Sequence, residues 1–277
     1  MEILAPAKVN LALRVLRRRD DGFHDIESLI VPVSIADRLE IERRETGGLD
    51  FTCSDPELPV DERNLVVRAV RLFCERFGVE PHLGINLKKE IPHGAGLGGG
   101  SSDAAATLLA LDQLFATHTP LDELAAQLGS DIPFFLQKSA ALVTGRGERV
   151  MPAPFPHALS LLLIKPPFGV PTPWAYQQWP DSREIPDVRY DAQELPWGTL
   201  IDDLERPVFE KYVFLAELKM WLLAQPEIAG ALMSGSGATI FGILHNVESV
   251  KELQARVHGV FGPDLWCRVA RTIAKAT

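Results

Sequence analysis

A glycine-rich loop between a predicted strand and a predicted helix places the strongest constraint on this chain. Five of the seven residues from Gly94 to Gly100 are glycine. Each glycine loses more backbone freedom on folding than any other residue, so the bare backbone must serve a purpose. Strand-like sequence precedes the loop, and the helix that follows has an apolar stripe of Ala104, Leu108, Leu111 and Phe115. We predict that the helix N-terminus and the loop N–H groups bind a phosphate. A simple turn before a capped helix is the alternative, but it needs fewer glycines.

Hydrophobic periodicity along the chain predicts an α+β fold in two domains. Residues 2–16 alternate as a strand, and the Asp-Gly turn at 17–22 predicts a hairpin with a returning strand over 23–33. Ten of the 21 prolines lie within residues 151–200, so we place a domain boundary there, giving domains 1–152 and 153–277. The other predicted strands are 37–45, 49–54, 83–91, a hairpin at 140–150, 159–164, 230–244 and 265–271; the predicted helices are 62–78, the one after the glycine loop, 121–129, 210–225 and 247–259.

Composition excludes several classes of protein. The net charge of −9 argues against a nucleic-acid partner. The longest apolar run, residues 158–164, is too short to span a membrane. Strand-like sequence begins at Ile3, so we expect no signal or transit peptide. The three cysteines, Cys53, Cys74 and Cys267, have neither metal-ligand nor disulfide-framework spacing. We therefore expect a cytoplasmic globular protein.

Two common phosphate-binding loops do not fit the context of this one. The letters "GAGLGG" satisfy the dinucleotide pattern G-x-G-x-x-G, but that pattern needs a second parallel strand ending in an acid. Asp112 and Asp122 lie instead in helical sequence. A Walker loop would close with Gly-Lys-Ser or Gly-Lys-Thr, which is absent here.

The loop instead resembles the phosphate loop of the GHMP kinases, with the pattern P-x-x-x-G-L-G-[GS]-S-S. It runs here from Pro92 to Ser102 with one additional glycine, and "APAKVNL" and "MSGSGATIFG" resemble two further motifs of the superfamily in the expected order. The stretches "PAKVNL", "DGFHDIESL", "GSDIPFF" and "GVPTPWAY" are most similar to the branch that acts on a cytidine diphosphate derivative of methylerythritol in non-mevalonate isoprenoid synthesis. Two positions depart from that branch: Phe23 replaces a tyrosine, and Asp202 replaces an asparagine.

This resemblance implies a fold and a reaction. The two-domain GHMP kinase fold has an N-terminal domain like the second domain of ribosomal protein S5 and a ferredoxin-like C-terminal domain. ATP, with Mg²⁺, would phosphorylate the 2-hydroxyl of the substrate. Another GHMP kinase of the mevalonate or homoserine type, a dinucleotide-dependent oxidoreductase and a non-catalytic nucleotide-binding protein are the alternatives. We expect small-molecule partners, no nucleic acid or membrane, and a monomer or weak homodimer.

The resemblance also implies two catalytic residues, Lys8 and Asp131. Lys8 and Asn10 share the polar face of the first strand, where a solvated lysine is the ordinary interpretation. In the family this lysine lies beside the reacting hydroxyl, and the aspartate of "GSDIPFF" accepts its proton. Asp131 also fits the N-cap of a short helix whose first turn holds Pro133, and the two roles are compatible.

The resemblance implies that aromatic residues hold the base of the substrate. Phe23 and Tyr176 would sandwich the cytosine, and His24 would bind the base edge, although Trp174 and Trp179 flank Tyr176. The full set implied to bind substrate is Asn10, Phe23, His24, Tyr176, Gly235, Ser236 and Gly237. The arginines of the hairpin, Arg14, Arg17, Arg18 and Arg19, are expected to be solvated, with steering of an anionic substrate as the second interpretation.

The residues implied to bind ATP are those of the glycine loop and its flanks. Ser101 and Ser102 can cap the helix and offer hydroxyls, and Lys89 either contacts the nucleotide or is a solvated edge lysine like Lys88. Asp103 is either a first-turn partner of the helix dipole or a group that reaches Mg²⁺ or a water on it, and the sequence leaves the Mg²⁺ ligands open. The predicted set is Lys89, Pro92, His93, Gly94, Ala95, Gly96, Leu97, Gly98, Gly99, Gly100, Ser101 and Ser102.

Overall fold

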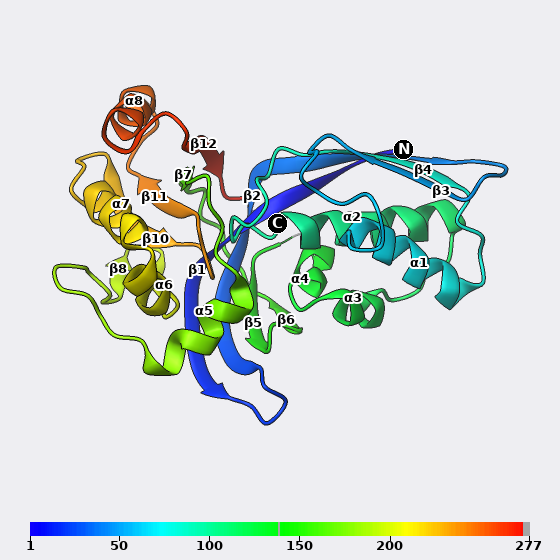
Figure 1. Ribbon diagram of the computed structural model, residues 1–277, viewed down its shortest axis with the longest axis horizontal. Helices are drawn as coiled ribbons and strands as arrows, with labels where there is room; N and C mark the ends of the chain where they lie inside the picture. Colours follow the sequence, from blue (N-terminus) through cyan, green and yellow to red (C-terminus); the bar gives the residue numbers. More distant parts are fainter. Residues whose placement is uncertain (138, 274–277) are drawn as a thin grey trace.

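Two β-sheets pack face to face in the computed structural model, which describes residues 1–137 and 139–273 (Figure 1). The first sheet has the order β3-β4-β2-β1-β9-β8, with β5 and β6 attached through β2, and the second has the order β10-β11-β7-β12. The strands are β1 Glu2–Arg18, β2 His24–Arg43, β3 Leu49–Cys53, β4 Leu83–Lys88, β5 Ala141–Gly145, β6 Arg149–Pro152, β7 Ser160–Lys165, β8 Gln193–Leu195, β9 Gly198–Asp202, β10 Ile228–Met233, β11 Ile240–Leu244 and β12 Trp266–Arg271.

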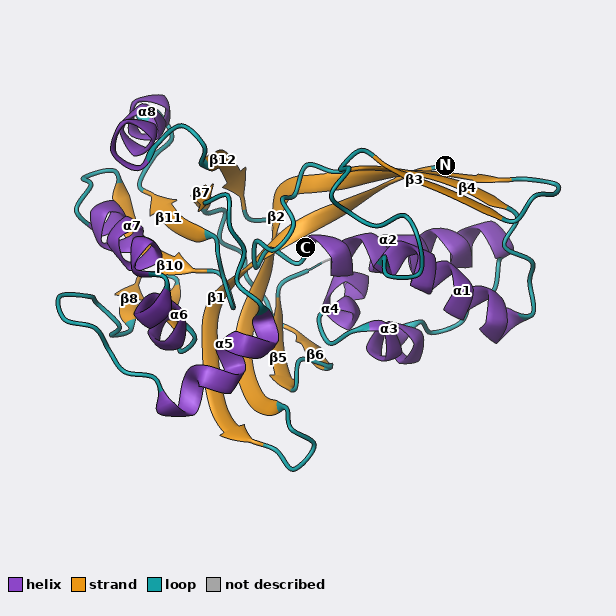
Figure 2. Cartoon of the chain, viewed as in Figure 1, coloured by secondary structure: helices purple, strands orange, loops and turns teal. Residues whose placement is uncertain are grey.

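Helices cover the outer faces of the two sheets (Figure 2). Four helices pack on the first sheet, and three pack mainly on the second, while α5 and a 3₁₀ turn lie near the hairpin of β1 and β2. This mixture of helices with mostly antiparallel strands confirms the predicted α+β class. The helices are α1 Leu65–Phe77, α2 Gly99–Phe115, α3 Asp122–Leu128, α4 Ile132–Gln137, α5 Thr172–Gln178, the 3₁₀ turn Trp179–Asp181, α6 Glu205–Lys211, α7 Val213–Leu223 and α8 Val250–Phe261.

Strand β2 is longer than the sequence predicted. Residues 23–33 and 37–45 were expected to form separate strands, but they form one strand of 20 residues. Its first half pairs with β5 and its second half with β4, while β1 pairs along both. Pro32 lies where the register with β1 shifts, and such irregularities tolerate a residue that lacks an N–H donor. The proline therefore does not end the strand.

The boundaries of two predicted helices also changed. The helix expected over 62–78 begins at Leu65, because the Asn64 side chain accepts the Val66 N–H at 2.9 Å and caps it. Gly78 ends that helix at φ 62°, as predicted. The helix expected over 210–225 is two helices, α6 and α7, which are separated by the non-helical backbone of Tyr212.

The first sheet contains strands from both sides of the expected boundary at residue 152. Strand β9 pairs in parallel with β1, so that Leu13 lies opposite Asp202. This pairing brings a carboxylate from the later part of the chain close to the first strand. None of the helices in residues 1–137 and 139–273 is long and apolar enough to cross a membrane.

Candidate active site

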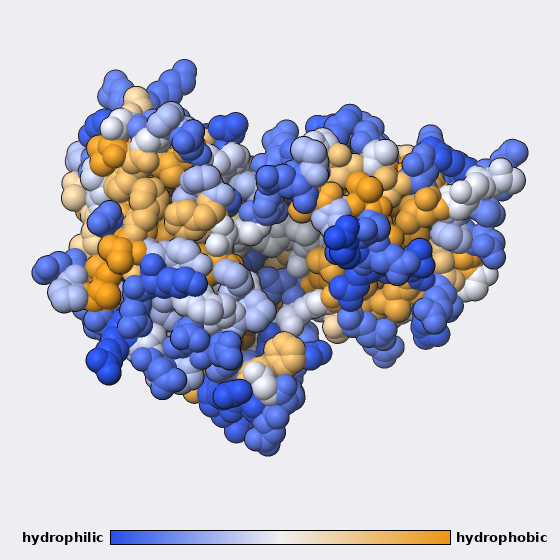
Figure 3. Space-filling view, in the orientation of Figure 1, coloured by the Kyte–Doolittle hydropathy of each residue, from blue (hydrophilic) through white to orange (hydrophobic). Residues whose placement is uncertain are grey.

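A cavity of about 930 Å³ lies where the glycine loop, the β1–β2 hairpin and helix α5 meet. Figure 3 shows the surface hollowed between the two parts of the molecule. Residues 94–100, the turn at 234–239, and the side chains of Lys8, Asp131 and Tyr176 all contribute to its lining. Its volume is in the range of pockets that bind small molecules and cofactors.

The glycine loop has the backbone that its composition predicts. Gly94, Gly96 and Gly98 have φ values of 62°, 73° and 72°, in the left-handed region that favours glycine. Helix α2 begins at Gly99, and Gly98 is its N-cap without a side-chain hydrogen bond. The prediction that Ser101 or Ser102 caps the helix is therefore wrong, because both lie within its first turns. The first N–H groups of the helix have no intrahelical acceptor, which leaves them able to bind an anion.

A second glycine turn, residues 234–239, packs directly on the glycine loop. The Ser234 hydroxyl donates to the Gly96 carbonyl at 3.0 Å, and the Thr239 N–H donates to the Ala95 carbonyl at 3.1 Å. A Cβ at Gly96 would lie 2.2 Å from the Ser234 carbonyl oxygen. The two loops therefore need glycine at their contact, and together they form one wall of the cavity.

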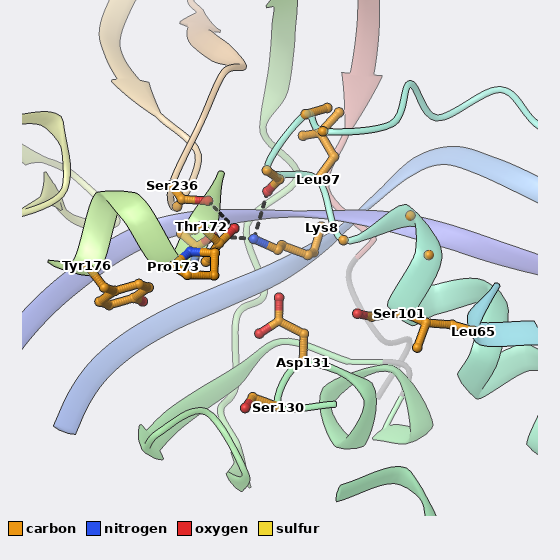
Figure 4. Close-up of a pocket in the computed structure, with 18 of the residues that line it drawn as sticks. Lys8, Leu65, Leu97, Ser101, Ser130, Asp131, Thr172, Pro173, Tyr176 and Ser236 are labelled. Atoms are coloured by element: carbon orange, nitrogen blue, oxygen red, sulfur yellow. Dashed lines mark hydrogen bonds between the residues drawn. The ribbon is translucent and has the colours of Figure 1, made fainter. Parts of the chain in front are cut away.

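Lys8 is buried in the cavity wall. Its side chain donates to Asn10 Oδ1 at 2.6 Å and to the Gly96 carbonyl at 2.7 Å, which joins β1 to the glycine loop (Figure 4). Burial lowers the pKa of the Lys8 ammonium, against the opposing effect of the Asp131 and Asp202 carboxylates. Lys8 is 5% exposed, so the solvated-lysine interpretation is wrong.

Asp131 lies on the opposite side of the cavity, between α3 and α4. Its carboxylate points toward the Lys8 ammonium (Figure 4). It accepts no hydrogen bond from the residues that the structure describes, so the predicted helix cap does not form within that part of the chain. A carboxylate that is not engaged by the backbone is available to a ligand in the cavity.

Asp202 is a second carboxylate near Lys8, but it is fully enclosed. Its Oδ1 accepts the Leu204 N–H at 2.9 Å, while its Oδ2 is buried without a partner among the described residues. Burial, followed by repulsion from Glu205, raises the pKa of Asp202 well above its usual range. Burial at the C-terminal end of β9 therefore favours the neutral form of this side chain, which an asparagine resembles in shape.

The aromatic residues predicted to hold a base line the end of the cavity near the hairpin. The His24 and Tyr176 rings stack with centroids 5.6 Å apart, and Phe23 is 49% exposed. Phe23, His24 and Tyr176 line the cavity, whereas Trp174 and Trp179 do not. Burial lowers the pKa of His24, which favours the neutral ring. Tyr176 is therefore better placed than either tryptophan to contact a ligand.

Lys89 belongs to a buried ion cluster beneath the glycine loop. Its ammonium contacts the Asp37 carboxylate and lies 2.8 Å from Asp103 Oδ2, and its side chain is only 6% exposed. The solvated-edge interpretation is therefore wrong for Lys89, whereas Lys88 is exposed and pairs with Glu40. Asp37 also accepts the N–H groups of Glu90 and Ile91 at 2.6 and 2.8 Å, which fixes the chain where it enters the loop.

Asp103 is the fifth residue of α2, so it is not the first-turn partner that the sequence suggested. Burial, offset in part by Lys89, raises the pKa of Asp103 to about 7. Its Oδ1 is buried and has no partner among the described residues, and the side chain lines the cavity beside Ser101. Asp103 Oδ1 and the Ser101 hydroxyl are both oxygen groups, the kind of ligand that Mg²⁺ prefers. Another oxygen-and-imidazole group, Asp55, Glu57 and His93, lies at the rim and is more exposed.

Several cavity residues were missed by the sequence reasoning. Thr172 and Ser130 lie within stretches already singled out, and the Thr172 hydroxyl is 2.7 Å from the Ser236 hydroxyl. Arg18 was placed with the solvated arginines, and Arg146 was not considered. The glycines on both sides of Arg146, with φ values of 72° and 114°, were the available signal for a specially shaped turn.

Comparison with known proteins identifies the class that this fold and site define. Residues 64–138 match the family model described as "GHMP kinases N terminal domain". A mevalonate kinase from Methanococcus jannaschii superposes with a TM-score of 0.62 over 99% of this chain and 98% of its own, at 14% identity, which shows a shared fold. The chain is a GHMP kinase.

Relatives of higher identity define the family. A 4-diphosphocytidyl-2-C-methyl-D-erythritol kinase from Methylacidiphilum infernorum is 40% identical over 96% of this chain and 94% of its own. The crystal structure of a 4-(cytidine 5′-diphospho)-2C-methyl-D-erythritol kinase superposes with a TM-score of 0.82, at 37% identity, over 98% of this chain and 99% of its own. The chain belongs to the 4-diphosphocytidyl-2-C-methyl-D-erythritol kinase family.

Proposed function

We propose that this kinase transfers the γ-phosphoryl group of ATP to the 2-hydroxyl of 4-diphosphocytidyl-2-C-methyl-D-erythritol, a step in non-mevalonate isoprenoid synthesis. The observation that carries the proposal is the position of Lys8 and Asp131 on opposite sides of one cavity that also contains the glycine loop (Figure 4). Relatives that carry this name at about 40% identity over most of the chain support this substrate above mevalonate or homoserine. The dinucleotide-dependent alternative has no support in that family.

Asp131 accepts the proton of the substrate hydroxyl, and the oxygen then attacks the γ-phosphorus. A new P–O bond forms, the bond between the γ-phosphorus and the bridging oxygen breaks, and ADP leaves. Lys8 stabilises the charge that develops on the hydroxyl oxygen and the transferred group. Its bonds to Asn10 and to the Gly96 carbonyl fix its ammonium in place before the substrate arrives, so little reorganisation is needed.

The glycine loop and the start of α2 bind the phosphates of ATP, with Lys89 and residues 92–101 lining that end of the site. Ser102, which was also expected to bind ATP, is buried in α2 and does not line the cavity. Lys89 stabilises the glycine loop from beneath, because its ammonium is held between two carboxylates. Ser101 and Asp103 Oδ1 are the oxygens that fit Mg²⁺, which would neutralise phosphate charge when bound. The turn at Gly235, Ser236 and Gly237 belongs to the same wall as the glycine loop and binds the substrate near its phosphates.

Phe23 and Tyr176 hold the cytosine, and His24 binds its edge. The exposed ring of Phe23 supports this role, since exposed aromatic rings are available to stack on a base. Phe23 keeps the aromatic ring of the tyrosine that is usual in the family, but it lacks the hydroxyl. Stacking by Phe23 therefore needs no contribution from that hydroxyl.

The proposal also assigns a type of fold to each of the two domains. The helices on one face of the first sheet support an S5-like N-terminal domain over 1–152, and the four-stranded antiparallel sheet with its helices supports a ferredoxin-like domain over 153–277. Cys53, Cys74 and Cys267 are all free, which supports a reducing cytoplasmic location. The chain is predicted to be a monomer or a weak homodimer, and analytical ultracentrifugation would measure this oligomeric state.

An assay of ADP release across a panel of acceptors tests the proposed function. The purified chain is incubated with ATP and Mg²⁺ together with diphosphocytidyl methylerythritol, mevalonate or homoserine. We expect turnover with the cytidine compound alone. Faster turnover with mevalonate or homoserine would contradict the proposed substrate, and no turnover with any acceptor would contradict the kinase reaction.

A further inference from the structure

The positively charged residues that line the cavity differ in whether another protein group already binds them. Lys8 donates to Asn10 and Gly96, and Lys89 is held by two carboxylates. Arg63 pairs with Asp61 at 2.8 Å. Among the residues that the structure describes, the guanidinium groups of Arg18 and Arg146 line the same cavity without an ion pair or a polar hydrogen bond. Five N–H donors on each are therefore free for a ligand.

Strand alternation explains why Arg18 faces the cavity while its neighbour does not. In the hairpin of β1 and β2, Arg18 lies opposite His24, and Arg17 lies opposite Asp25. Cross-strand partners share one face of a sheet, and successive residues alternate between faces. Arg17 accordingly pairs with Asp25 at 2.7 Å on the outer face. Arg18 lies on the inner face with His24, which lines the cavity.

Arg146 reaches the same end of the cavity from β5. It follows Gly145, which pairs with Ile26 in β2, and its backbone N–H donates to Glu148 at 2.7 Å. Its guanidinium lies over the Phe23 ring, 5.1 Å from the centroid, a cation–π contact that orients it without using its N–H donors. One arginine from β1 and one from the turn after β5 therefore line this end of the cavity, and the guanidinium of Arg146 lies over the ring proposed to stack on cytosine.

The nearby acid forms no ion pair with Arg18 or Arg146 among the described residues. Asp21 also lines the cavity, but both of its carboxylate oxygens accept from Arg19, at 3.2 and 3.0 Å. A chain with a net charge of −9 thus presents two unpaired positive charges at this end of the cavity. Guanidinium groups match phosphate oxygens in geometry as well as in charge.

We propose that Arg18 and Arg146 bind the diphosphate group of the nucleotide substrate, a role that rests on the proposed function. A nucleoside diphosphate whose base stacks on Phe23 carries its phosphates within the reach of a long side chain beside that ring. The two arginines then select a phosphorylated cytidine over free cytidine, while the glycine loop binds ATP separately.

Binding of cytidine, CMP and CDP to the full chain, measured by calorimetry, tests this inference. We expect the double variant Arg18→Ala/Arg146→Ala to bind CDP about ten- to a hundredfold more weakly than the wild type, since charge-assisted hydrogen bonds are lost. Cytidine affinity should change by less than about twofold, and CMP should fall between them. Arg146→Lys should retain part of the affinity for CDP, because the charge remains.

Arg17→Ala is the matched control, because Arg17 is on the same hairpin but pairs with Asp25 outside the cavity. We expect it to leave CDP affinity unchanged. Equal losses for cytidine and CDP in the double variant would overturn the inference, since the arginines would then support the base site. An unchanged affinity for CDP would also overturn it. Failure of the wild type to bind either ligand, with no ADP release from the cytidine substrate, would instead contradict the proposed function.

Discussion

The two ends of the cavity are built in different ways. At the end near α2, the backbone of the glycine loop forms the surface, and its flanking charges are already paired with one another. At the end near the hairpin, side chains form the surface, and two arginines have no polar partner among the described residues. The first end is preformed by packing, whereas the second is completed by its ligand. Substitutions should therefore affect fold and nucleotide binding at the first end, and substrate affinity at the second.

The largest effect is expected at Gly96, where the two glycine loops touch. A side chain in Gly96→Val would meet the Ser234 carbonyl, because even a Cβ would lie 2.2 Å from it. The backbone there also has a φ of 73°, which strains a β-branched residue. We expect a large fall in melting temperature and the loss of ATP binding, measured by thermal unfolding and calorimetry.

Gly100→Ala is the control for the Gly96 variant. A Cβ at Gly100 would make an ordinary contact, 3.6 Å from Leu65 Cδ1, and the residue lies within α2. We expect it to stabilise the fold by up to about 1 kcal/mol, since alanine favours a helix more than glycine does. Equal behaviour of the two variants would contradict a preformed loop.

An intermediate effect is expected at Phe23, at the other end. Phe23→Ala should weaken binding of the cytidine substrate by about 1–3 kcal/mol, the usual contribution of an aromatic ring that stacks on a base. ATP affinity and melting temperature should change little, because the ring is half exposed. Calorimetric titration of each ligand measures the two affinities. A loss shared equally by ATP and the cytidine substrate would mean that Phe23 supports the fold and not the base.

The smallest effect is a change with pH beneath the glycine loop. Folding raises the pKa of Asp103 from its ordinary value to about 7, so the folded chain binds more protons than the unfolded chain between these values. The stability contributed by this group is therefore lost as pH rises toward 7. Asp103→Asn cannot titrate. We expect its melting temperature relative to the wild type to increase by about 2 °C or more between about pH 5 and about pH 8.

A constant difference in melting temperature between the Asp103→Asn variant and the wild type over that pH range would contradict the raised pKa of Asp103. Asp122→Asn is the control, because Asp122 is exposed on the neighbouring helix α3. The difference in melting temperature between the Asp122→Asn variant and the wild type should not change across the same pH range.

The contrast between the two ends also explains which parts of the site the sequence revealed. A backbone-built loop leaves a compact signal, and the glycines from Gly94 to Gly100 predicted both the loop and the helix after it. The hairpin turn was equally local, since an Asp-Gly pair favours such a turn whatever surrounds it. These features depend on neighbours in the chain and need no distant contact.

Features that depend on distant contacts were not predicted. Asp37 contacts Lys89 across 52 positions of the chain, and nothing near either residue indicates the other. Residues 23–33 and 37–45 were expected as separate strands, yet they form one strand, and a register shift with β1 accommodates Pro32 within it. Arg18 and Arg17 are indistinguishable in the sequence, and only the pairing of β1 with β2 separates their faces.

The central claim is that Asp131 accepts the proton of the reacting hydroxyl, and the turnover of Asp131→Asn tests it most directly. The substitution keeps the size of the side chain but cannot accept the proton, so kcat for ADP release with the cytidine substrate should fall by roughly 10²–10⁴-fold. KM values and the melting temperature should change little, because neither ground-state binding nor a helix cap depends on this carboxylate. Lys8→Ala should also lower kcat, and the double variant should lose much less than the product of the two single losses. A folded Asp131→Asn enzyme that turns over within a few-fold of the wild type would contradict the account.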